Sequence, residues 1–156
     1  MEKIKRDGDR VDVDVLTDGD VEAPEVTGGY IMKIDRADPG DSGFGAAGQG
    51  IRYVYPKEKL IESGVRNPQR QYIKGYMDDF GAALNGPNFT DQERGYRAFV
   101  EVDAWIDHHL LNVLAKNVDA LRLSTYFFKA RGGKLEMGPI WDFDRSMDST
   151  DGRDDN

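Results

Sequence analysis

Two runs of apolar residues at helical spacing, flanked by strand-like sequence, most constrain how this chain can fold. Apolar side chains recur every three or four residues through residues 67–85, and the same spacing returns through residues 103–116. Such spacing places apolar side chains on one face of an amphipathic helix. Asn67-Pro68 is a helix start signal with Asn67 as the N-cap, and Asn85-Gly86-Pro87 ends that helix. The predicted buried face of the second helix comprises Trp105, Ile106, His109, Leu110, Val113 and Leu114.

The sequence on both sides of these helices favours strands. Val and Asp alternate in residues 10–16, the period-two pattern of a half-exposed strand, and β-rich runs follow at 28–35 and 51–55. After the helices, Gly132-Gly133 joins residues 125–129 to 134–137 as a β-hairpin. Thr90 and Glu93, three residues apart, predict a capping box opening a short helix. We therefore expect an α+β fold, with small sheet pieces, two main helices and then a hairpin.

Composition excludes several classes of function. The 156 residues carry 21 basic and 29 acidic side chains, a net charge of −8, whereas binding to a nucleic-acid backbone needs clustered positive charge. We therefore expect no nucleic-acid partner. The chain has no cysteine, which excludes disulfides and thiolate zinc sites. No apolar run approaches the roughly 20 residues of a membrane span, so we expect none.

Two further motifs have ordinary structural interpretations. Residues 43–48 spell G-x-G-x-x-G, but a strand-like segment follows where a dinucleotide site needs a helix. We expect a flexible connection there, with phosphate contact as the alternative. His108 and His109 are the only histidines. We expect each to be packed or at the surface, His109 being the one on the apolar helix face, with a role as ligand or base as the alternative.

Asp142 and Asp144 follow the hairpin and flank Phe143. On an extended segment, two carboxylates two residues apart point to the same side, where they repel unless a cation or an arginine lies between them. Such a pair suits Mg²⁺, which also keeps waters and substrate phosphate. The alternative is a loop whose acids cap backbone amides or pair with Arg145. Asp119 lies 23 residues earlier, at the end of the second helix, and is either a turn residue or part of the same site.

An acid, then a hairpin, then an Asp-Phe turn is also the order found in protein kinases. Longer blocks strengthen that likeness, and with them the chain resembles the CotH kinase family, atypical protein kinases named after a bacterial spore-coat protein. The resemblance covers nearly the whole chain. Its distinctive blocks are residues 29–35, 102–107, 114–120, 124–129 and 138–144, the last reading Gly-Pro-Ile-Trp-Asp-Phe-Asp.

The resemblance implies a role for each acid. Asp119 would be the catalytic aspartate, Asp142 a metal ligand and Asp144 a second acidic contact. Ser124 stands where ordinary kinases have an asparagine as a second metal ligand, and its hydroxyl could still bind the ion. Mg²⁺ or Mn²⁺ and ATP would be the cofactors. The activity implied is phosphoryl transfer to Ser or Thr of secreted or coat proteins, at an extracellular, cell-surface or spore-coat location.

By the same resemblance, residues 1–147 are part of a kinase domain, the larger lobe of a kinase-like fold. The nucleotide-covering lobe and the C-terminal helices would lie outside this chain. Residues 148–156 would form a disordered acidic tail. We therefore expect the 156 residues alone to be weakly active or inactive. The rival is a non-catalytic binding or structural module of a cell surface or coat. Metal-dependent hydrolysis by the same acids is a third possibility, without a convincing water-activating partner.

Overall fold

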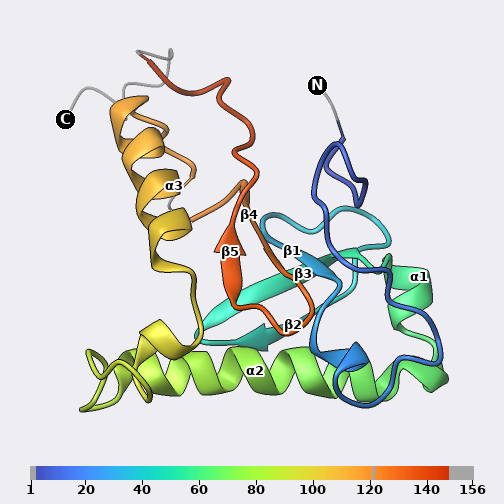
Figure 1. The fold of residues 1–156 in the computed structure, drawn as a ribbon. Helices are drawn as coiled ribbons and strands as arrows, with labels where there is room; N and C mark the ends of the chain where they lie inside the picture. The colour runs from blue at the N-terminus through green and yellow to red at the C-terminus, as the bar shows by residue number, and fades with distance from the viewer. Residues whose placement is uncertain (1–2, 121, 148–156) are drawn as a thin grey trace.

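A five-stranded antiparallel sheet organises the computed structural model, which describes residues 3–120 and 122–147 (Figure 1). The strand order is β2-β3-β1-β4-β5. Their bounds are β1 Tyr30–Ile34, β2 Gly43–Ala46, β3 Gln49–Tyr55, β4 Thr125–Lys129 and β5 Leu135–Met137. The predicted α+β class is confirmed, and the early strands and the late hairpin share one sheet because β1 pairs with β4. The predicted tail, residues 148–156, lies outside the described residues.

Both predicted main helices are present. α2 (Asn67–Asn85) runs along the lower edge of the molecule in Figure 1, and α3 (Val102–Leu114) stands beside β5. Asn67 is already helical and Arg66 is the N-cap, one residue earlier than predicted. The short elements are α1 Glu58–Ile61 and the 3₁₀ turns η1 Glu25–Thr27, η2 Gly64–Arg66 and η3 Tyr96–Ala98. No helix among the described residues is long and apolar enough to span a bilayer.

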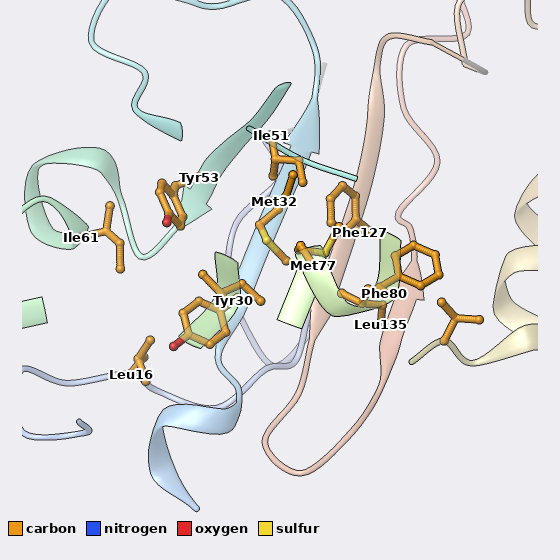
Figure 2. Packing of buried hydrophobic residues seen from close by; sticks show 13 residues of the cluster. Leu16, Tyr30, Met32, Ile51, Tyr53, Ile61, Met77, Phe80, Phe127 and Leu135 are labelled. Carbon is orange, nitrogen blue, oxygen red and sulfur yellow. The ribbon is translucent and has the colours of Figure 1, made fainter. Parts of the chain in front are cut away.

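The main core lies between α2 and one face of the sheet (Figure 2). Ile73, Met77 and Phe80 lie at helical spacing on α2, and all three are buried, as the apolar pattern predicts. Full burial of a side chain of this size contributes about 1.5–3 kcal/mol. Because side chains alternate along a strand, Tyr30 and Met32 join this core while Ile31 points into a second cluster. That cluster comprises Ile4, Val11, Val13, Ile31 and Tyr126.

The strand predicted for residues 10–16 is wrong. Val11 forms only an isolated bridge with Arg6, and residues 12–16 are irregular. Val11 and Val13 are buried as the alternation predicts, but Val15 is 49% exposed. The Arg6 side chain donates from Nε to the Val13 carbonyl at 2.8 Å, so this backbone carbonyl accepts a hydrogen bond from a side chain and not from a neighbouring strand.

The flexible connection predicted for residues 43–48 is also wrong, because this segment is β2 and its turn into β3. A Cβ at Gly43 would lie 2.0 Å from the Ile51 carbonyl oxygen on β3. Ala47 and Gly48 both have positive φ, as a tight two-residue hairpin turn requires. Close strand pairing therefore accounts for Gly43, and the tight turn accounts for Gly48, without a phosphate.

The short helix predicted at Thr90 does not form. Asp91, not Thr90, caps the local backbone: its Oδ1 accepts the N–H groups of Glu93 at 3.0 Å and Arg94 at 2.9 Å. Aspartate side chains commonly hold such turns in place of a helix. The helical backbone that follows is limited to the 3₁₀ turn η3.

The predicted buried face of α3 is wrong in most of its members. Ile106, His109, Leu110, Val113 and Leu114 are exposed, whereas Trp105 is half-buried. The buried positions of α3 are His108 and Asn112, and the Asn112 side chain donates to the His108 carbonyl at 2.8 Å. The apolar pattern predicted the wrong face because the side of α3 that is buried carries two polar side chains, which are hydrogen-bonded to each other.

Candidate functional site

The turn that carries Asp119 is held by the end of α3. Lys116 leaves the helix in the left-handed conformation, with φ of 50°. Asn117 is buried, and it donates from its backbone N–H to the Asn112 carbonyl and from Nδ2 to Asn112 Oδ1. The Asp119 carbonyl then accepts the N–H groups of Arg122 and Leu123, which closes a tight turn. A buried polar ladder along α3 therefore positions this aspartate.

The Asp119 carboxylate lies between two guanidinium groups. Oδ1 is 3.2 Å from Nη2 of Arg122, which belongs to the same turn. Oδ2 is 3.6 Å from Nη1 of Arg145, which follows the second acidic segment. The Asp119 side chain is 13% exposed. Two cationic side chains therefore orient this carboxylate, which keeps some access to solvent.

Asp142 does not lie on an extended segment, so the geometry assumed from sequence is wrong. Its φ is 61°, in the left-handed region. Ser124, just before β4, also has a positive φ of 50°, and its Oγ donates to Asp142 Oδ2 at 3.2 Å. Non-glycine residues keep such conformations where the surroundings constrain them, and these positions are common at functional sites. A hydrogen bond therefore joins two unusual backbone positions, one from each predicted site segment.

The electrostatics of Asp142 suit a cation ligand. Burial raises the pKa of its carboxyl group, and the negative charge of Asp144 raises that pKa further. The Ser124 hydrogen bond lowers it, and the more distant charge of Asp35 again raises it. A divalent ion between Asp142 and Asp144 would reverse the repulsion between these carboxylates. Asp142, Asp144 and Ser124 are thus brought together, while Asp119 joins this group through Arg145.

The oxygen donors of Asp142, Asp144 and Ser124 fit Mg²⁺ or Mn²⁺ that keeps part of its water shell better than a metal ion bound by protein ligands alone. Within residues 3–120 and 122–147, no group of three or more His, Asp or Glu side chains is arranged to hold a metal ion. Mg²⁺ does not need such a cage, because one or two carboxylates suffice when waters and substrate phosphates complete its shell. Asp142 and Asp144 supply that number of carboxylates, and Ser124 adds a neutral oxygen.

Asp35 and the Asp119 contact of Arg145 were not predicted from the sequence. Asp35 ends the segment that contains β1, and β1 pairs with β4 so that Ile34 lies opposite Thr125, next to Ser124. An acid directly after a strand was the available signal, but only the pairing reveals its neighbours. Arg145 was expected as a possible partner of Asp142 or Asp144, and the structure shows that it also lies beside Asp119.

Both histidines lie on α3 and line a cavity together with Arg122 and Thr125. His108 is buried and His109 exposed, the reverse of the predicted arrangement. Burial lowers the pKa of His108, and the neighbouring charge of His109 lowers it further. Asn112 contacts the His108 ring. His108 is therefore a packed histidine of the α3 ladder, in agreement with the structural interpretation.

Comparison with known families places the whole chain in one of them. The profile of the family described as CotH kinase protein matches residues 1–156. Searches of curated proteins and of solved structures found no match. The match agrees with the ordered blocks around Asp119 and Asp142, and it covers the full sequence. The chain therefore belongs to the CotH kinase family.

Proposed function

We propose that this chain carries the acidic part of a protein kinase site that transfers phosphate from ATP to a Ser or Thr hydroxyl. The observation that carries the proposal is the Ser124–Asp142 hydrogen bond at 3.2 Å, together with the Asp119–Arg145 pair at 3.6 Å. These two contacts bring the turn of Asp119 next to the segment of Asp142. Phosphoryl transfer needs mainly such positioning and charge stabilisation.

Each residue has a distinct role in this proposal. Asp142, with Asp144 or Ser124, would hold Mg²⁺ or Mn²⁺, which neutralises phosphate charge when bound. Asp119 would orient the acceptor hydroxyl and take its proton. As the hydroxyl oxygen bonds to the γ-phosphorus, the bond from that phosphorus to the bridging oxygen breaks and ADP leaves. The two arginines beside Asp119 hold its carboxylate in one orientation, in which its oxygens can accept a hydrogen bond from the acceptor hydroxyl.

The acceptors in this proposal are secreted or coat proteins, at an extracellular, cell-surface or spore-coat location, as family membership suggests. We expect the 156 residues alone to transfer phosphate weakly or not at all, because residues 1–147 would be part of a kinase domain. Robust turnover by the isolated chain that is abolished by Asp119→Ala would contradict that expectation while supporting the role of Asp119.

Divalent-metal binding tests the proposed site without requiring turnover. Mg²⁺ and Mn²⁺ are titrated into the wild-type chain and Asp142→Ala, with heat or fluorescence as the signal. We expect Asp142→Ala to bind at least tenfold more weakly, because it removes one of two carboxylate ligands. Asp107→Ala removes an exposed acid of α3 and is the matched control. Equal binding by wild type and Asp142→Ala would refute the metal role.

A non-catalytic binding module is the second candidate, and one observation favours it. α3 carries a set of exposed apolar side chains, and a cavity of about 440 Å³ lies between α2, α3 and the sheet, lined on α3 by Trp105, His108 and His109. Large exposed apolar surfaces commonly mark interaction sites. Absence of metal binding in both wild type and Asp142→Ala would favour this candidate. The exposed members of the surface are Ile106, Leu110, Leu111, Val113 and Leu114.

A further inference from the structure

The segment from Asp142 to Met147 is attached at its start to the residue before β4 and at its end to the C-terminal end of α3. Ser124 Oγ donates to Asp142 Oδ2 at the start of the segment. At its end, the Met147 N–H donates to the Ala115 carbonyl at 2.9 Å, at the C-terminal end of α3. Helix carbonyls in this position lack partners within the helix, so the contact satisfies one of them. Arg145 lies between these two attachments.

Arg145 is the side chain of this segment that lies beside Asp119. Its Nη1 is 3.6 Å from Asp119 Oδ2, on the oxygen opposite the one that Arg122 approaches. Arg122 is three residues from Asp119 and belongs to the same turn. Arg145 is separated from Asp119 by the whole β4–β5 hairpin. The Arg145 pair therefore connects the two acidic segments, whereas the Arg122 pair stays within one of them.

We infer that Arg145 is a positioning residue that holds the Asp119 carboxylate at a set place relative to Asp142. The inference rests on the proposed function, since it assigns Asp119 and Asp142 to one reaction. At 3.6 Å the contact is an ion pair rather than a bidentate hydrogen-bonded fork, so positive charge at this position matters more than guanidinium shape. Loss of the pair removes the ion pair that ties Asp119 to the segment after Asp142, while the Arg122 pair within the turn remains.

Small displacements of a catalytic group are costly, since a misplacement of about 1 Å can lower a rate by about a hundredfold. For Arg145→Gln in the natural full-length protein, we expect kcat to fall between about tenfold and about a hundredfold. The KM for ATP and the Mn²⁺ affinity should stay within about threefold, because Arg145 is not a proposed metal ligand. Arg145→Lys keeps the charge and should restore most of kcat.

The experiment measures phosphate incorporation and Mn²⁺ binding for these variants. Arg94→Gln removes an exposed arginine from a similar pair with Asp91, at 3.4 Å and far along the chain, and is the matched control. On an Asp119→Asn background, Arg145→Gln should cause little further loss, since residues that act as one unit are not additive. Unfolding curves establish that each variant is folded. If Arg145→Gln does not fold, the kcat of Arg145→Lys relative to wild type tests the positioning role.

The outcomes separate this inference from the proposed function. Wild-type kcat in folded Arg145→Gln, or a folded Arg145→Lys as impaired as Arg145→Gln, overturns the positioning role and leaves the proposed function standing. Parallel losses of kcat and Mn²⁺ affinity also overturn it, because Arg145 would then act on the metal segment. Full activity in Asp119→Ala, or no transfer by the wild type, overturns the proposed function and this inference with it.

Discussion

Lys129 on β4 is a buried cation whose removal should change how stability depends on pH. The residue is 1% exposed, and its Nζ donates to the carbonyls of Thr27 at 2.6 Å and Gly133 at 2.7 Å. The ring centroids of Tyr76 and Tyr72 lie 4.6 and 5.7 Å from Nζ. These contacts do not offset the loss of hydration, and burial lowers the pKa of Lys129 from 10.5 to about 8.

The sign of the effect follows from proton binding. Above about pH 8 the folded protein releases the Lys129 proton, while the unfolded chain keeps it until its own pKa of 10.5. The unfolded state therefore binds more protons in this window, and stability rises with pH. Between about pH 7.5 and about pH 9.5, the integrated gain from this one group is about 2 kcal/mol, at about 1.4 kcal/mol per pH unit. Lys129→Met lacks the gain.

The assay is urea unfolding at several pH values, followed by tryptophan fluorescence. We expect the free energy of unfolding of wild type minus that of Lys129→Met to rise by about 2 kcal/mol across the window. Comparing the two proteins cancels the titration of the other groups. Lys74→Met, which removes a half-exposed ammonium on α2, is the control. A difference for Lys129→Met that stays flat or falls with pH would contradict a lowered pKa of Lys129 in the folded protein.

Three other predictions concern single contacts. Gly43→Ala should lower the unfolding free energy by about 2 kcal/mol or more, because its methyl group would overlap the facing strand; Gly45→Ala, with open space around it, should not, as thermal unfolding can establish. Wild type should lose stability below about pH 6.5, because folding disfavours protonated His108, and His108→Gln should reduce that loss; equal acid sensitivity would contradict this. Ser124→Ala should raise the pKa of Asp142 further, measurable by NMR titration, and an unchanged value would argue against their hydrogen bond.

Local sequence patterns correctly predicted the elements that are formed by contacts between residues close together in the chain. α2 follows from the spacing of Ile73, Met77 and Phe80 together with its end signals, and these apolar residues are buried as expected. The β4–β5 hairpin follows from Gly132-Gly133 between two β-rich runs. In such elements the periodicity of the backbone itself determines which side chains share a face.

Long-range contacts explain the failures. Residues 10–16 alternate like a strand, but they have no continuous strand partner, and Arg6 contacts Val13 instead. The apolar side chains of α3 suggested one buried face, but the buried positions are His108 and Asn112, which lie on a different face and are hydrogen-bonded to each other. Hydrophobicity alone does not predict the burial of a polar side chain, because a hydrogen bond inside the protein can offset the loss of its hydration.

Composition and periodicity are local properties, and they were enough to predict the α+β class, the two main helices, the hairpin and the order of the residues Asp119, Ser124, Asp142 and Asp144. The folded structure was needed to show that Asp142 has a left-handed conformation beside Ser124 and that Arg145 lies beside Asp119. It likewise decided that β1 lies next to β4 and brings Asp35 near the acids. These features depend on contacts between segments that are far apart in the sequence, and a local pattern does not specify which distant segments come together.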